Sequence, residues 1–241
     1  MLSYWPSVAQ ALVPSRACRW RLLASWCCAL VVSLPGAHAA DAEPAGQLMR
    51  PRAVVLHVHA DIGDRRFLPA LTQRLEKALA PPVHVLTTSV ELATLRPAIG
   101  KMDAALLAEN LVRGIDWTRH AQTVQVLLIL DDMRLRPANF NFAVSNGTPA
   151  TPHHVIVVSL ARLQDRAIRG GEDKDPGMTA ERVAKMVLKN VARVAGYAHS
   201  DRCVFGFPRN LGELDAAPAG YCEPDLSVLV SAGIARRLLA P

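Results

Sequence analysis

The chain has 241 residues, of which 51% are hydrophobic and 5% aromatic, and its formal net charge is +6 at pH 7. This hydrophobic content is enough to bury a core, which excludes a disordered or collagen-like protein. The scarcity of aromatic residues argues against a surface on which nucleic-acid bases stack. The length suits one domain, alone or with a short appendage.

The start of the chain has the order of residues found in secretory signal peptides. Three arginines precede an apolar run over residues 22–34, and Ala37-His38-Ala39 follows with the small residues that signal peptidase accepts. The run is shorter than the roughly 20 residues of a membrane-spanning helix. We therefore expect residues 1–39 to be a cleaved signal peptide and the protein to be periplasmic or secreted, with no membrane span in the mature chain. An uncleaved anchor is the alternative.

Removal of this segment changes what charge and cysteine content imply. Its three arginines leave a net charge of about +3 on the rest of the chain, which gives no evidence for a nucleic-acid partner. Three of the five cysteines also lie in the segment. Cys203 and Cys222 remain, and an even pair in an exported protein can form a disulfide.

Apolar runs and helical periodicity alternate along the rest of the chain. After a polar tether over residues 40–52, apolar runs predict strands at residues 53–59, 83–88, 123–130 and 155–160. Periodicity predicts helices at residues 65–80, 102–113, 179–195 and 225–239. Gly196 is placed to end the third helix, and the chain from there to residue 224 is rich in loops. This alternation indicates an α/β fold with one compact domain over residues 53–241.

The most specific pattern lies in residues 189–222. The zinc motif of the metzincin peptidases is H-E-x-x-H-x-x-G-x-x-H, in which two histidines one helical turn apart and a third beyond a glycine turn bind the metal. At the motif positions this chain has Lys189, Asn190, Arg193, Gly196 and His199. The glycine and the third histidine are kept, whereas both helical histidines and the glutamate are replaced.

The flanking residues resemble the archaemetzincins, a branch of the metzincin zinc peptidases. That family has four cysteines that bind a second, structural zinc ion. Here Ser200 and Asp225 stand at the first and last of these positions, and Cys203 and Cys222 stand at the other two. Phe205 stands where the family has the methionine of its methionine turn.

The upstream chain resembles the same family. The predicted strands at residues 123–130 and 155–160, with the alternating stretch 139–144 between them, are similar to the strands that precede the family's zinc helix. The resemblance spans residues 54–222. It implies a metzincin-like domain with a mixed sheet, an antiparallel edge strand and a long zinc-motif helix near residues 179–195.

The replaced residues imply that the family's zinc chemistry is lost. Zinc needs neutral or anionic donors, whereas Lys189 and Arg193 are cations that repel it. Asn190 cannot take a proton from water, which is the role of the family's glutamate. Only His199 survives as a metal ligand, so we expect no cofactor, no catalytic residue and a pseudoprotease with a binding or regulatory role.

The two remaining cysteines favour a disulfide over zinc, because two thiolates rarely hold a structural zinc ion alone. Two free thiols and a residual metal site are the alternatives. A bridge between Cys203 and Cys222 would close a loop of roughly 20 residues. In the chain-entropy account, this cross-link stabilises the folded protein by about 3 kcal/mol.

Four cations share one face of the helix predicted at residues 179–195: Arg182, Lys185, Lys189 and Arg193. The simpler interpretation is a solvated face. If the resemblance holds, Lys189 and Arg193 face the family's cleft, where they and His199 can bind an anion such as a peptide carboxylate or a phosphate. A peptide or protein is then the expected partner.

Two further interpretations stay open, a structural periplasmic domain and an active zinc peptidase with other ligands. The histidines available to such a peptidase are His57, His59, His153 and His154. We expect the first two to be hydrogen-bonded on their strand and the last two to be solvated. Asp131 and Asp132 end a strand, where acidic side chains usually cap a helix or bind backbone N–H groups.

Overall fold

The computed structural model describes residues 48–88, 92–97, 100–135, 140–165, 171–197, 201–206 and 208–237, all within the unit Glu43–Pro241. The predicted signal peptide, His199 and Ser200 lie outside the described residues. None of the helices in the described part of the chain has the length and apolar character needed to cross a bilayer.

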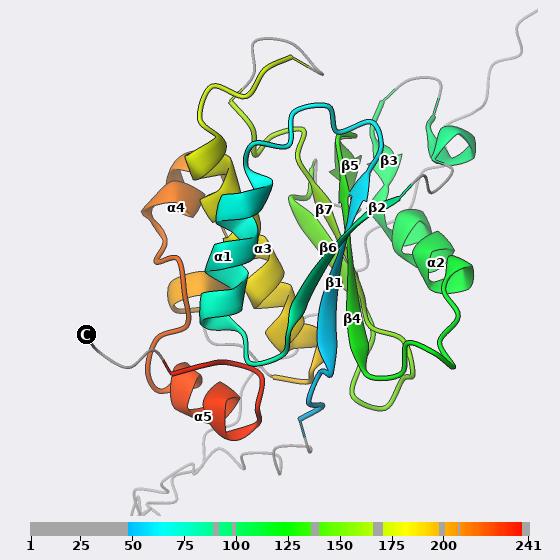
Figure 1. Ribbon diagram of the computed structural model, residues 1–241. Helices are drawn as coiled ribbons and strands as arrows, with labels where there is room; N and C mark the ends of the chain where they lie inside the picture. Colours follow the sequence, from blue (N-terminus) through cyan, green and yellow to red (C-terminus); the bar gives the residue numbers. More distant parts are fainter. Residues whose placement is uncertain are drawn as a thin grey trace, which may run out of the picture. The chain divides into compact units, whose positions relative to one another are not determined.

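Five strands form a mixed sheet in the order β2-β1-β4-β7-β6 (Figure 1). Four of them are parallel: β1 (Ala53–His59), β2 (Val83–Thr88), β4 (Thr123–Ile129) and β7 (Val155–Ser159). The edge strand β6 (Ala143–Asn146) pairs antiparallel with β7, as the resemblance implied. Two short strands, β3 (Met102–Asp103) and β5 (Met133–Arg134), form a separate parallel pair.

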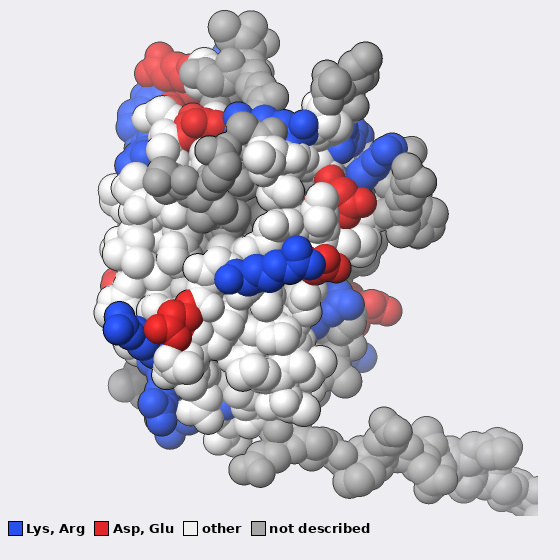
Figure 2. All heavy atoms as spheres, turned by 90° about the vertical axis from the view of Figure 1, so that its right-hand side faces the viewer, with Lys and Arg blue, Asp and Glu red and all other residues white. Residues whose placement is uncertain are grey.

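Helices cover both faces of the sheet, which explains why its central strands are continuously apolar. The helices α1 (Leu68–Ala78) and α3 (Pro176–Val194) lie on one face, and α2 (Ala104–Gly114) lies on the other (Figure 1). Alternate side chains of β4 therefore enter two cores: Val126 and Leu128 pack toward α1 and α3, and Leu127 and Ile129 toward α2. On the α2 side most of the visible surface is uncharged (Figure 2).

The long helix α3 starts earlier than the periodicity predicted and ends where it predicted. Asp175 caps the first turn by accepting from the Met178 N–H at 2.8 Å, and Pro176 takes the first position. At the other end Gly196 has φ +92°, and the Tyr197 N–H donates to the Ala192 carbonyl at 3.0 Å. This is a Schellman ending, which a left-handed glycine allows.

The last part of the chain is more helical near residue 211 and less helical near its end than predicted. A short helix, α4 (Leu211–Ala216), lies in the stretch expected to be loop, with Asn210 as its cap. The helix α5 (Asp225–Ser231) is shorter than the predicted 225–239, because Gly233 ends it in a second Schellman motif with φ +70°. Two single turns of 3-10 helix, η1 (Ala93–Leu95) and η2 (Cys203–Phe205), complete the described elements.

Packed structure begins within the segment expected to be a tether. The Met49 side chain is 8% exposed, and its backbone N–H donates to the Ala195 carbonyl at 2.9 Å. The Arg52 N–H donates to the Gln122 carbonyl at 2.8 Å. Residues 48–52 are thus held against the end of α3 and the start of β4.

Candidate functional site

The three replaced motif positions lie in the last turns of α3. Asn190 is 6% exposed, and its side-chain amide donates to the Met186 carbonyl one turn earlier at 2.8 Å. The Lys189 ammonium donates to the Gly206 carbonyl at 2.9 Å, which ties the helix to the segment after η2. Arg193 is exposed. Two of the three side chains therefore bind protein carbonyl groups.

The electrostatics of this site follow from two cations one helical turn apart. Burial lowers the pKa of Lys189, and the charge of Arg193 lowers it further, while Asp201 acts in the opposite direction. Because Arg193 disfavours the single charge of Lys189, it would disfavour a divalent ion at the same place more strongly.

These residues do not fit a zinc ion. A charged lysine and an arginine have only N–H donors, so neither offers zinc a lone pair. The amide of Asn190 is buried within its own helix turn. Across the described ranges, no three His, Cys, Asp or Glu side chains gather closely enough to hold a metal ion. The donor set that the described chain presents here is therefore the wrong one for this metal.

The segment that faces these positions is closed by a disulfide. Cys203 and Cys222 are bonded, with Cα atoms 6.0 Å apart, which is the pairing expected from the sequence. Asp225, at the fourth cysteine position of the family, is buried, and its carboxylate accepts a hydrogen bond from the Tyr197 hydroxyl. The disulfide between Cys203 and Cys222 thus covalently links the segment after α3 to the segment before α5.

Phe205, at the place of the family's methionine, is the centre of an aromatic cluster. Its ring centroid lies 5.4 Å from that of Tyr197 and 5.6 Å from that of Tyr221. The Tyr221 hydroxyl donates to the Leu188 carbonyl at 2.7 Å. Burial and the neighbouring Asp225 raise the pKa of Tyr197 to about 12. This cluster packs the segment 201–222 onto α3.

The interpretation of the four helix cations as a solvated face is wrong for Arg182 and Lys185. Arg182 forms two hydrogen bonds of 2.6 Å with the Asp215 carboxylate, and this contact lowers the pKa of Asp215. The Lys185 side chain is 1% exposed, and its ammonium contacts Glu181 at 2.9 Å and donates to the Leu214 carbonyl at 2.9 Å. The helix α4, which the sequence did not predict, covers the Arg182 and Lys185 end of this row of four cations on α3.

The four histidines do not converge on a common site. His57 donates from Nε2 to the Gln125 side chain at 2.6 Å, and the His59 Nδ1 accepts from the Asp61 N–H at 3.2 Å. His154 was expected to be solvated, but it is 1% exposed and burial lowers its pKa. It is buried because the loop before β7 folds over it, with the Thr148 carbonyl accepting from its Nε2 at 3.0 Å.

Asp131 and Asp132, at the end of a strand, both bind arginines, a contact that their position alone did not predict. Arg96 donates to both oxygens of Asp131, at 3.1 and 3.0 Å. Arg162 donates to Asp132 with its shortest contact at 2.9 Å. The sequence held no signal for these pairs, because the partners are about 30 or more residues away along the chain.

No protein-family model and no curated protein sequence matches the chain. Solved structures similar to it include two archaemetzincins and a zinc-dependent peptidase. An archaemetzincin from Archaeoglobus fulgidus, complexed with malonate, has a TM-score of 0.55 and 19% identity over 73% of this chain and 98% of its own. An archaemetzincin from Methanopyrus kandleri has a TM-score of 0.56 and 21% identity over 78% and 97%.

The third structure is a zinc-dependent peptidase from Methanocorpusculum labreanum, with a TM-score of 0.55 and 22% identity over 73% of this chain and 98% of its own. Nearly the whole length of each of these proteins is matched, although the identities are low. Such a likeness establishes a fold. This chain therefore has an archaemetzincin-like fold, with Lys189, Asn190 and Arg193 on its long motif helix.

Proposed function

We propose that this chain is a catalytically inactive archaemetzincin-like protein, a pseudoprotease, that binds an anionic peptide or protein segment without cleaving it. The observation that supports the proposal is the set of residues on α3, the motif helix, at the positions where the family has its zinc ligands. Its two former histidine positions hold cations, Lys189 and Arg193, and the Lys189 ammonium is bonded to the Gly206 carbonyl. A metal ion would have to displace this contact and overcome both charges.

The proposed loss of hydrolysis follows from acid–base chemistry. Peptide hydrolysis by this family's route requires a base that removes a proton from the attacking water and an electrophile that polarises the carbonyl. Asn190 has no proton-accepting group of suitable basicity, and its amide is already bonded to Met186 inside the helix. Neither requirement is met by the described residues at this site.

The proposed binding role rests on the charge that remains. Arg193 is exposed and forms no ion pair within the described residues. A guanidinium binds a carboxylate through two parallel N–H groups. The archaemetzincin of Archaeoglobus fulgidus was solved in complex with malonate, and we use this dicarboxylate as the probe for a carboxylate site at Arg193.

Metal content and peptidase activity test the loss of catalysis. Protein purified from an exporting host should contain no stoichiometric zinc and should hydrolyse fluorogenic peptides no faster than background. Lys189→His with Arg193→His should gain zinc affinity, since His199 supplies a third imidazole, and Asn190→Glu added to this pair should be needed for hydrolysis. Tight binding of one zinc ion with peptide cleavage by the unaltered protein would show that the proposal is wrong.

A matched control separates a restored site from two added histidines. Glu109→His with Arg113→His places two imidazoles at the same i, i+4 spacing on the exposed part of α2, where the two native side chains form an ion pair at 3.6 Å. This variant should bind zinc clearly more weakly than the α3 variant. Equal affinity of the two would remove the support for a metzincin frame at residues 189–199.

Titration with malonate tests the binding role. Arg193→Gln should weaken binding by about tenfold, the loss expected for one charged hydrogen-bonding partner. Arg113→Gln, a change of the same chemistry at an exposed position on α2, across the sheet from α3, should leave it unchanged. Binding that is insensitive to Arg193→Gln would place the carboxylate elsewhere.

Export belongs to the same proposal and has its own test. We propose that residues 1–39 are removed and that the bond between Cys203 and Cys222 forms in an oxidising compartment. N-terminal sequencing of the exported protein should find a chain that starts near Ala40 or Asp41. Recovery of intact Met1 in the soluble cytoplasmic fraction would contradict it.

A further inference from the structure

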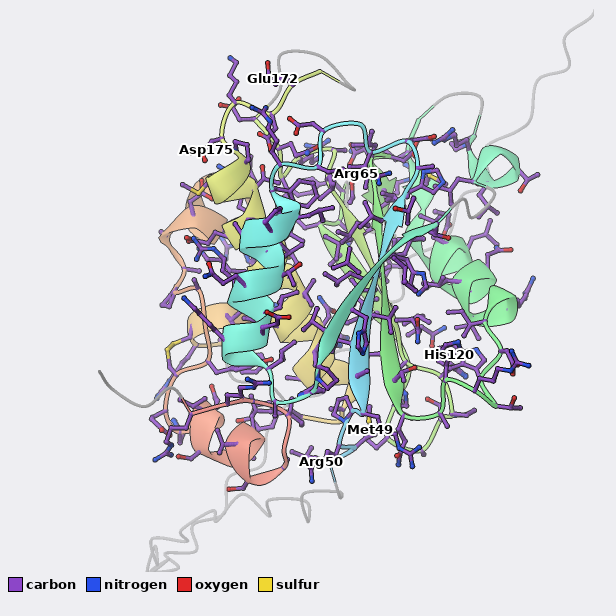
Figure 3. All side chains as sticks on the ribbon, in the orientation of Figure 1. Met49, Arg50, Arg65, His120, Glu172 and Asp175 are labelled. Carbon is purple, nitrogen blue, oxygen red and sulfur yellow. A yellow bond between two sulfur atoms is a disulfide. The ribbon has the colours of Figure 1, made fainter. Side chains whose placement is uncertain are left out.

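A cavity of about 410 Å³ lies at the amino-terminal end of the parallel strands. Three segments that directly precede β1, β2 and β4 line it: residues 50–52, residues 80–82 and Gln122. Gly233, just after α5, completes the lining. Figure 3 shows Met49 and Arg50 at this end of the sheet, beside α5. None of these residues belongs to the motif helix.

The described residues that line the cavity carry a net positive charge. Arg50 and Arg52 are both exposed, and neither forms an ion pair within the described residues. None of the described residues that line the cavity is an aspartate or a glutamate. A third guanidinium, that of Arg236, donates to the carbonyl of the lining residue Ala80 at 3.4 Å. Arg96, by contrast, contacts two carboxylates at the opposite end of the sheet.

The backbone that carries the two arginines is held on both sides. The Met49 N–H is bonded to Ala195 and the Arg52 N–H to Gln122, so the segment between them has a defined path. The Arg50 side chain lies directly over Gly233, where an added Cβ would be 2.7 Å from the arginine Nε and 3.0 Å from its Cδ. Because Gly233 has no side chain, the Arg50 side chain can pack directly against its backbone.

The cavity wall has two further features of a binding site. Pro51, Pro81 and Pro82 give it a rigid apolar surface without N–H groups. Gln122 has φ +60°, a left-handed conformation that is costly for a residue other than glycine and that clusters at functional sites. The volume is in the range of small-molecule sites, about 300–1,000 Å³.

We infer that this cavity binds a small organic anion, with a carboxylate or phosphate head held by Arg50 and Arg52 and a compact apolar body against the prolines. Guanidinium groups bind both head groups through paired N–H donors. An apolar body is expected because Pro82, which lines the cavity beside the arginines, is exposed and can pack against it. The site shares no residue with the proposed cleft on α3 and does not depend on its function.

Isothermal titration of the purified protein with phenyl phosphate and with benzoate tests the inference. At least one of the two should bind saturably with 1:1 stoichiometry, and the tighter one identifies the head group. Benzyl alcohol, which has the ring without the charge, should not bind. Arg50→Gln and Arg52→Gln should each weaken binding by about tenfold, as expected for a charged hydrogen-bonding partner.

Two controls assign the effect to this cavity. Arg50→Lys with Arg52→Lys keeps the charge and removes the paired N–H geometry, so it should weaken binding less than the double glutamine variant. Arg113→Gln, at an exposed position on α2, should leave binding within twofold of the unaltered protein. Binding that persists unchanged in the double glutamine variant, or that Arg113→Gln weakens as much as Arg50→Gln does, would overturn the inference.

A measurement on the unaltered protein makes the test independent of the variants. The ring protons of bound phenyl phosphate or benzoate should give nuclear Overhauser effects to side-chain protons of Pro51, Pro81 or Pro82. Saturable binding with contacts to other residues only would overturn the inference, as would the absence of saturable binding of both probes.

Discussion

The two halves of the cationic row on α3 differ in how their charges are compensated. In the first half, carboxylates neutralise both cations: Asp215 contacts Arg182, and Glu181 contacts Lys185. In the second half, Lys189 is bonded to the Gly206 carbonyl and Arg193 is exposed. The first half is covered by α4, and the second half ends in the exposed Arg193 at a position where the motif of the family has a metal ligand.

The difference shows that residue type alone does not decide the role of a charged side chain. A cation that is buried beside a carboxylate stabilises the fold, because removal of one partner leaves the other without compensation. A cation at the surface without such a partner contributes little to stability and stays available to a ligand. Substitutions along this single row should therefore have graded effects on the free energy of unfolding.

Lys185→Met should have the largest effect. Methionine keeps the apolar stem but removes the ammonium, which leaves the Leu214 and Asp215 carbonyls without this donor and Glu181 with Arg74 as its remaining ion-pair partner. We expect a loss of about 3 kcal/mol in the free energy of unfolding. Urea unfolding of the purified variant measures it, and a loss below about 1 kcal/mol would show that this half of the row is not structural.

Removal of the disulfide should cost nearly as much. Cys203→Ser with Cys222→Ser opens a loop whose ends are 19 residues apart and frees the segment that covers α3. The chain-entropy account predicts a loss of about 3 kcal/mol. Reduction of the unaltered protein should give the same shift in urea midpoint as the double serine variant. A shift on reduction that persists in this variant would place the redox-sensitive group elsewhere.

Lys189→Met should have a smaller effect that depends on pH. Its hydrogen bond to Gly206 is partly exposed, so its loss should cost about 1 kcal/mol. Burial and Arg193 lower the pKa of Lys189 in the folded protein below its ordinary value of 10.5. The unfolded chain therefore binds more protons in this window, and the lysine's contribution to stability rises as pH rises from the lowered value toward 10.5.

The measurement must separate this lysine from the tyrosines. Burial raises the pKa of both Tyr197 and Tyr221, so unfolded tyrosines ionise first and stability falls above about pH 10 for that reason. The difference in unfolding free energy between the unaltered protein and Lys189→Met cancels this contribution. That difference should increase with pH below 10.5, and a flat difference would contradict the assigned cause.

Arg193→Gln should have the smallest effect on stability. The side chain is exposed, so its replacement should change the free energy of unfolding by less than about 0.5 kcal/mol. The same variant is expected to weaken malonate binding. A large loss of stability would instead make Arg193 a structural residue like Lys185, and the contrast between the two halves would disappear.

Much of the fold could be predicted because it depends on local patterns. The continuous apolar run of β4 requires burial on both faces, and Gly196 ends α3 as its position indicated. The short helix α4 was missed because six residues give too little periodicity to recognise. The helix α5 was predicted too long because an apolar pattern continues past Gly233, where the left-handed glycine reverses the chain.

The sequence by itself determined the chemistry available at the motif positions. At residues 189 and 193 a charged lysine and an arginine offer no lone pair, and the asparagine at residue 190 is not a base, whereas the motif of the family supplies imidazoles and a carboxylate at these positions. The sequence also predicted that Cys203 pairs with Cys222, which the bond between them confirms. These conclusions depend on residue type and spacing, which are local properties of a sequence.

Only the tertiary structure decided which cations are compensated and which are not. The partners of Lys185 and Lys189 include carbonyl groups of Leu214 and Gly206, and every residue has a carbonyl, so no sequence pattern marks them. The cavity beside Arg50 likewise forms where three segments from distant parts of the chain meet before their strands. Compensation and enclosure depend on distances between such segments, and these distances exist only once the chain has folded.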